Sequence, residues 1–132
     1  MADPTPDSRN DERWKLELSP EAFHVMRQHG TERAGSSPLN FEKRTGQYRC
    51  AACGTPLFES GTKYESGSGW PSFYAPLPGA VATRTDETSG LRRVEVHCAR
   101  CGGHLGHVFP DGPRPTGERY CMNGVALRFE PS

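Results

Sequence analysis

The chain has 132 residues, a length that corresponds to one domain, and only 33% of its residues are hydrophobic. Its 15 glycines and 12 prolines favour many turns and few long helices. We therefore expect a small core that requires additional stabilisation, for example by a bound metal ion. The 16 basic and 16 acidic residues give a formal net charge of zero, which argues against a nucleic-acid-binding surface.

Residues 1–12 are polar and contain prolines, so we expect a disordered tail in front of a single domain over residues 13–132. The N-terminus has neither the positive nor the apolar segment of a secretory signal, and no apolar run approaches the roughly 18 residues of a membrane span. We therefore expect a cytoplasmic monomer without membrane contacts, in a compartment where disulfides are rare.

The first regular elements are an arm and a helix. Residues 14–18 alternate apolar and charged side chains, which predicts a short extended arm. Ser19 is a favourable N-cap, Pro20 suits the first helical position, and Gly30 suits the position after the last turn. These signals predict a helix over about residues 20–29. Its apolar stripe consists of Ala22, Phe23, Val25 and Met26.

The rest of the chain is typical of β structure. Residues 80–85 and 91–98 predict a hairpin, and shorter strands are expected near residues 120–123 and 125–129. Residues 64–74 carry two glycines before a Trp-Pro pair, which predicts a loop that positions an aromatic cluster. We predict a mostly β, antiparallel domain with one N-terminal helix. In the second hairpin strand the alternation predicts one face with Val94, Val96 and Cys98 and the opposite face with Arg93, Glu95 and His97.

Four of the five cysteines form two Cys-x-x-Cys-Gly segments, Cys50 with Cys53 and Cys98 with Cys101. Two intervening residues let both sulfurs of a pair reach one ion, and the glycine that follows tolerates the tight turn. Four thiolates around a tetrahedral ion are the structural zinc arrangement, so we predict a closed zinc site that clamps two distant parts of a sheet. Bound iron, redox dithiols or disulfides are the alternatives.

The fifth cysteine, Cys121, is the candidate nucleophile. Arg119 precedes it by two residues on a predicted strand, shares its face and would stabilise a thiolate. His104 and His107 lie near a turn that returns the chain to Cys121, and either would protonate a leaving oxygen. The alternatives are a buried, inert cysteine and histidines that bind a metal or support the fold.

The aromatic residues Trp70 and Phe73 belong to the glycine-rich segment. They are interpreted either as walls of a pocket for an apolar group or as parts of the core.

Several segments together resemble the type-B methionine sulfoxide reductases, enzymes that reduce the R epimer of methionine sulfoxide. The resemblance covers about Trp14 to Phe129, and the two cysteine pairs match the zinc-bearing members of the family. The matching segments are Leu18–Glu21, Gly30–Arg33, Gly67–Phe73 (Gly-Ser-Gly-Trp-Pro-Ser-Phe), His104–Phe109 (His-Leu-Gly-His-Val-Phe), Asp111–Pro113 and Gly117–Asn123 (Gly-Glu-Arg-Tyr-Cys-Met-Asn).

This resemblance implies two antiparallel β-sheets with peripheral helices, and we expect the four-cysteine zinc site to staple the two sheets together. It implies that Cys121 attacks the sulfoxide sulfur and becomes a sulfenic acid, in a protein-repair reaction on oxidised methionine in peptides and proteins, and more weakly on the free amino acid. The residues that it places around Cys121 and the substrate oxygen are His104, His107, Asp111, Arg119 and Asn123. The substrate contacts that we expect are Trp70, Phe73 and Phe109.

The chain departs from the family pattern at Ser68, where many members carry a second, resolving cysteine. If the other four cysteines bind zinc, Cys121 has no partner for an internal disulfide. We therefore expect an external thiol reductant, thioredoxin or glutaredoxin with glutathione, to complete the cycle. The competing interpretations are a zinc-stapled module that binds a ligand without turnover and a zinc ribbon of nucleic-acid machinery. The lone thiol beside an arginine argues against the first, and the zero net charge against the second.

Overall fold

The computed structural model describes residues 18–28, 30–87 and 92–132. The predicted N-terminal tail, most of the extended arm, residue 29 and the turn of the predicted hairpin lie outside the described residues. No helix in the described part of the chain is long and apolar enough to cross a membrane.

The chain first forms helix α2, Pro20–Gln28, as its capping signals predict. Ser19 Oγ accepts a hydrogen bond from the Ala22 amide at 3.1 Å, and the Gly30 amide donates to the His24 carbonyl at 3.0 Å. Ala22, Val25 and Met26 are buried, whereas Phe23 is only half-buried.

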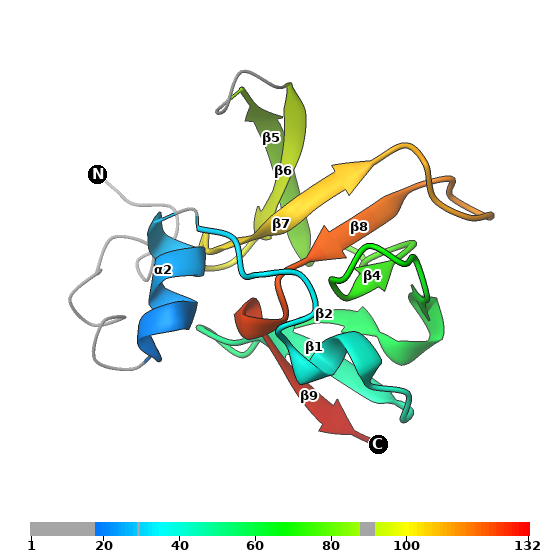
Figure 1. Ribbon diagram of the computed structural model, residues 1–132, viewed down its shortest axis with the longest axis horizontal. Helices are drawn as coiled ribbons and strands as arrows, with labels where there is room; N and C mark the ends of the chain where they lie inside the picture. The colour runs from blue at the N-terminus through cyan, green and yellow to red at the C-terminus, as the bar shows by residue number, and fades with distance from the viewer. Residues whose placement is uncertain (1–17, 29, 88–91) are drawn as a thin grey trace.

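Two antiparallel sheets make up the body of the described chain (Figure 1). One has three strands in the order β2-β1-β9, and the other has six in the order β3-β4-β8-β7-β6-β5. The predicted mostly β fold with two antiparallel sheets is therefore confirmed. The strands are β1 Gly46–Cys50, β2 Pro56–Glu59, β3 Lys63–Tyr64, β4 Ser72–Phe73, β5 Val81–Asp86, β6 Arg93–Cys98, β7 His104–Phe109, β8 Arg119–Met122 and β9 Leu127–Pro131. Three short 3₁₀ turns are η2 Pro38–Phe41, η3 Ser60–Thr62 and η5 Gly124–Ala126.

An aromatic cluster joins the two sheets. Phe73 of β4 stacks on Phe58 of β2 with ring centroids 4.3 Å apart and meets Tyr48 of β1 edge-on at 5.0 Å. All three side chains are fully buried. The expectation that Phe73 contacts substrate is therefore corrected: its ring lies in the core, because it packs between the sheets against Phe58 and Tyr48.

The glycine-rich segment ends in a strand, which the sequence did not predict. Ser72–Phe73 forms β4 and pairs with β3 on one side and β8 on the other. The predicted loop is thus followed directly by a short central strand. This pairing holds the loop beside Cys121.

The hairpin of β5 and β6 is confirmed within the described residues, but the predicted facing of β6 is wrong in part. Val94 is 40% exposed and Glu95 is 2% exposed. Val94 and Glu95 pair regularly with Val108 and His107, and the register of β6 against β7 shifts only beyond them, between Val96 and His97. Glu95 is tolerated in the interior because both Arg84 and His104 bind its carboxylate.

Candidate functional site

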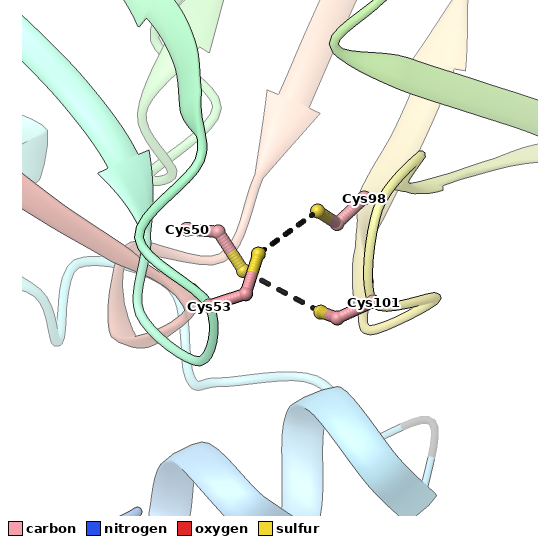
Figure 2. A group of neighbouring side chains, drawn as sticks. All are labelled: Cys50, Cys53, Cys98 and Cys101. Carbon is pink, nitrogen blue, oxygen red and sulfur yellow. Dashed lines mark hydrogen bonds between the residues drawn. The ribbon is translucent and has the colours of Figure 1, made fainter. Parts of the chain in front are cut away.

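The four sulfurs of the two cysteine pairs converge on one point between the sheets (Figure 2). The Sγ atoms of Cys50 and Cys101 lie 3.7 Å apart, those of Cys53 and Cys98 lie 3.6 Å apart, and all four lie within 4.8 Å of one another. A tetrahedron of metal–sulfur bonds of about 2.3 Å has edges of about 3.8 Å, whereas a disulfide requires about 2.0 Å. The spacing therefore fits four ligands of one metal ion, and these cysteines are not disulfide-bonded in this structure.

The two cysteine segments have the same local geometry, as their common sequence predicts. The amide of Gly54 donates to the Cys50 carbonyl at 2.9 Å, and the amide of Gly102 donates to the Cys98 carbonyl at 2.9 Å. Both glycines have a positive φ, 82° and 77°, a conformation that disfavours a side chain.

The cysteine site joins the two sheets, as expected for two sheets held together at the four cysteines, and not two parts of one sheet as the cysteine spacing alone suggested. Cys50 ends β1 of the three-stranded sheet, and Cys98 ends β6 of the six-stranded sheet. Arg27 of α2 also donates through Nη2 to the Cys101 carbonyl at 3.0 Å. One ion would therefore hold both sheets, and through Arg27 the helix as well.

Cys121 lies in a row of directly paired residues that crosses the six-stranded sheet. Because opposite residues of paired strands share a face, these side chains lie on one face of the sheet. From β5 to β4 the row contains Arg84, Glu95, His107, Cys121 and Ser72. The sheet thus aligns a cysteine with a histidine on one side and a hydroxyl on the other.

Cys121 is partly buried, and its nearest hydroxyl belongs to Ser68, whose Oγ lies 3.9 Å from Sγ. Burial raises the pKa of the Cys121 thiol above its ordinary value, while hydrogen bonding from Ser68 and the nearby Arg119 oppose that increase. The resting group is therefore a thiol, and it needs a base before it can act as a nucleophile.

A cavity of about 100 Å³ opens in front of Cys121. Its size admits the end of one side chain but not a large ligand. Its walls include His107, Trp70, Phe109, Asn123 and Arg93. Of the predicted site residues the structure brings these first four together with Cys121, whereas His104, Asp111 and Arg119 lie outside the cavity wall and Phe73 lies in the core.

The two histidines have different settings, although their rings are only 5.4 Å apart. His104 is 3% exposed and its Nδ1 donates to Glu95 Oε2 at 2.7 Å. His107 faces the cavity, and its Nε2 donates to Asp86 Oδ2 at 2.8 Å. Burial lowers the pKa of His107, and the hydrogen bond to Asp86 opposes the decrease. His107 is therefore neutral at rest, with Nδ1 available as a base.

The Arg119 guanidinium is fixed by two residues. Its Nε and Nη2 donate to the two carboxylate oxygens of Asp111 at 2.9 and 3.3 Å, and it lies 4.5 Å above the ring of Phe109. The hydrogen bond from Arg119 lowers the pKa of Asp111. This arrangement places a permanent positive charge near Cys121. It also supports Phe109, which forms part of the cavity wall.

Trp70 and Asn123 are held by the same residue, Glu32. Trp70 Nε1 donates to the Glu32 carbonyl at 3.0 Å, and the Glu32 amide donates to Asn123 Oδ1 at 2.9 Å. The Glu32 carboxylate accepts hydrogen bonds from the amides of Gly124 and Val125 at 2.8 and 2.9 Å. The segment after α2 thereby fixes both the indole wall and the turn that follows Cys121.

Four polar residues of the site were absent from the sequence-based set. Glu32 was noted only within a matching segment. Asp86 fell between the two strands of the predicted hairpin, and Arg93 and Glu95 were assigned to the face opposite Val94 and Val96. Their partners lie 7 to 93 positions away in the chain, so no local spacing marks them. The one sequence feature that could have identified them is the presence of several charged residues on strands that were expected to be half-buried.

Comparison with known proteins places the chain among a single set of relatives. The SelR domain family matches residues 18–131. A protein of Agrobacterium fabrum is 54% identical over 94% of this chain and 93% of its own length, and one of Leptospira interrogans is 55% identical over 93% and 95%. A protein of Leifsonia xyli is 56% identical over 94% of this chain and 91% of its own. All three are named peptide methionine sulfoxide reductase MsrB.

Proposed function

The chain belongs to the SelR domain family, and from this membership we propose a reaction centred on Cys121. Like the relatives that it matches, the chain is a type-B methionine sulfoxide reductase, an oxidoreductase that converts methionine sulfoxide to methionine. The observation that carries the assignment of the site is the direct pairing of Cys121 with His107 at a cavity walled by Trp70.

In the proposed first step, Cys121 Sγ forms a bond to the sulfoxide sulfur while the sulfoxide oxygen gains a proton. The oxygen then moves to Sγ, so that an Sγ–oxygen bond forms while the sulfur–oxygen bond of the substrate and the Sγ–sulfur bond both break. One thiol and one sulfoxide therefore give one sulfenic acid and one thioether. Cys121 is oxidised by two electrons and the methionine sulfur is reduced by two. No other oxidant or reductant takes part in this step.

We propose that His107, and not His104, moves the proton. His107 lines the cavity, whereas His104 is buried and engaged by Glu95. Asp86 holds Nε2 of His107, so Nδ1 accepts the proton of the Cys121 thiol and then donates it to the sulfoxide oxygen. Arg119 stabilises the thiolate by its charge. His104, Asp111 and Asn123 act indirectly, by positioning these groups.

The selection of the R epimer is also proposed to arise in this cavity. A sulfoxide is chiral at sulfur, so fixing its methyl group and its oxygen determines which epimer presents its sulfur to Cys121. The indole of Trp70, held by the Glu32 carbonyl, offers an apolar contact to the methyl group, and His107 offers a donor to the oxygen. Phe109 extends the apolar wall.

The metal is proposed to be zinc in a structural role. Cys50, Cys53, Cys98 and Cys101 would hold it and would leave no open coordination position, so it supplies stability and no chemistry to the reaction. Cys121 then remains the only cysteine without a metal. Ser68 cannot form a disulfide, so an external thiol must condense with the sulfenic acid, releasing water, and a second thiol must reduce the mixed disulfide. Thioredoxin or glutaredoxin with glutathione would supply these thiols.

The test is epimer-resolved turnover of peptide methionine sulfoxide with dithiothreitol as the reductant. The proposal expects the R epimer to be consumed and the S epimer to remain. Cys121→Ser should abolish turnover and keep the fold by circular dichroism. Retained turnover in this variant would overturn the assignment of Cys121.

A further inference from the structure

Arg93, the first residue of β6, forms part of the wall of the Cys121 cavity. Its side chain is 31% exposed, but its Nε atom is buried and has no hydrogen-bond partner among the described residues. Arg119, on the same sheet, contrasts with it because Asp111 satisfies both its Nε and its Nη2. A buried guanidinium N–H normally has an acceptor, so the Arg93 donor needs an explanation.

The nearest carboxylate does not satisfy Arg93. Asp86 lies directly opposite on β5, and its Oδ2 accepts the hydrogen bond from His107 Nε2 at 2.8 Å. The same oxygen is 3.7 Å from Arg93 Nη2, which is too far for a hydrogen bond. Asp86 therefore balances the charge of Arg93 without using its Nε donor, and this donor remains for a group that enters the cavity.

The position of Arg93 relative to His107 indicates which part of the substrate Arg93 would contact. His107 is 12% exposed and Arg93 is 31% exposed, so His107 lies deeper and Arg93 lies nearer to the solvent. The volume of about 100 Å³ is filled by the end of the methionine sulfoxide side chain. The main chain of the substrate stays at the rim, where its strongest acceptors are carbonyl or carboxylate oxygens. Arginine binds such oxygens through directed N–H groups.

We propose that Arg93 binds a main-chain carboxyl or carbonyl oxygen of the oxidised methionine and so makes the enzyme prefer amino acid and peptide sulfoxides to simple sulfoxides. The inference rests on the proposed function, because it takes the sulfoxide as the occupant of the cavity. Arg93 is then a specificity-determining residue that contributes to KM, while His107 and Cys121 determine kcat.

The test compares substrates with and without a main chain. N-acetylmethionine sulfoxide amide carries main-chain carbonyls, and N-acetylmethionine sulfoxide also carries a carboxylate. Methyl propyl sulfoxide has the side-chain atoms and the Cα carbon but no main-chain polar group. Arg93→Met should raise KM about tenfold or more for the first two and change kcat less than about twofold. The kcat/KM for methyl propyl sulfoxide should stay unchanged. A larger loss with the carboxylate than with the amide would identify the carboxylate as the preferred acceptor.

Arg92→Met is the matched control, because Arg92 is 79% exposed, pairs with Glu87 and is not part of the cavity wall. Arg93→Lys keeps the charge without the Nε donor, so it should show an intermediate KM, and it serves as the test variant if Arg93→Met does not fold. Equal losses on all three sulfoxides, or an unchanged KM, would overturn the inference. Failure of the unsubstituted enzyme on every sulfoxide would instead contradict the proposed function.

Discussion

Cys121 of β8 and His107 of β7 are directly opposite residues of one antiparallel strand pair. Gly106 makes this close pairing possible, because a Cβ at this position would lie 2.1 Å from the Cys121 carbonyl oxygen. The proposed nucleophile and its proposed proton-transfer partner therefore lie on two hydrogen-bonded strands and not on loops. Their relative position is set by the register of the six-stranded sheet.

This pairing predicts that the two histidines are not equivalent. His107→Gln should slow the oxidation of Cys121 by one substrate equivalent about 10²-fold to 10⁴-fold, because it removes the proton relay. His104→Gln should act mainly on stability, since its ring supports the buried Glu95. Single-turnover kinetics measure the rate of Cys121 oxidation in both variants. His24→Gln, on the exposed face of α2, is the control. A greater loss of rate in His104→Gln would reverse the assignment.

The pH dependence follows from the directions of two pKa shifts. Burial moves the pKa of His107 below its ordinary 6.5 and that of Cys121 above its ordinary 9.0. The reactive pair, thiolate with imidazolium, contains the same number of protons as the resting pair of thiol and neutral imidazole. We therefore expect kcat/KM to be level between about pH 7 and 9, to fall in acid as His107 gains a second proton, and to fall in base as the thiol ionises. A steady rise from pH 6 to 8 would instead indicate a preformed base other than His107.

Glu95 is expected to contribute to stability in a defined pH range. Burial alone would raise its pKa, but hydrogen bonds from His104 and Arg84 outweigh burial and lower the pKa from 4.5 to about 2. The folded-state pKa is depressed, so the stabilisation is present above about pH 4.5 and is lost as the pH falls through about 2. Glu95→Gln should lower the free energy of unfolding at pH 7 by on the order of 3 kcal/mol.

Urea unfolding of Glu95→Gln at pH 7 and at pH 3 tests the predicted direction of this pH dependence. The difference from the unsubstituted protein should shrink at the lower pH. Glu130→Gln, whose side chain is 63% exposed in a pair with Arg49, should change the free energy of unfolding little. A difference for Glu95→Gln that is constant from pH 7 to pH 3 would show that the charge of Glu95 is not the cause.

The metal site predicts that metal content and stability are lost together. Cys101→Ser should reduce the bound metal, measured by elemental analysis, and lower the Tm, because an ion held by the four cysteines would join the two sheets. Cys121→Ser is the matched control and should keep both the metal and the Tm. If Cys101→Ser retained its metal and its Tm, the four cysteines would not act as one site.

The parts predicted from sequence are those determined by near neighbours in the chain. The Cys-x-x-Cys-Gly spacing determines both turns, and Ser19 and Gly30 mark the ends of α2. The order of the strands and their assignment to the two sheets were not predicted. The spacing of the cysteines does not say that Cys50 and Cys98 belong to different sheets, because strand order is determined by pairing between distant segments.

The errors at Phe73 and Glu95 have a common cause. Each side chain is placed by a partner from another strand, Phe58 for the first and His104 for the second. An aromatic residue next to a glycine-rich loop is compatible with a pocket or a core, and an alternating strand predicts an outward glutamate. The ion pairs of Glu95 with His104 and Arg84 make its burial possible against that expectation.

The central claim, that Cys121 is the only redox-active cysteine and is regenerated by an external thiol, is tested by mass spectrometry after one turnover without reductant. The account predicts one added oxygen, trapped by dimedone on Cys121, with the other four cysteines unmodified. Ser68→Cys is the positive control, since the Ser68 hydroxyl lies 3.9 Å from Cys121 Sγ and a thiol there should give a 68–121 disulfide. An intramolecular disulfide as the stoichiometric product of the unsubstituted protein would contradict the account.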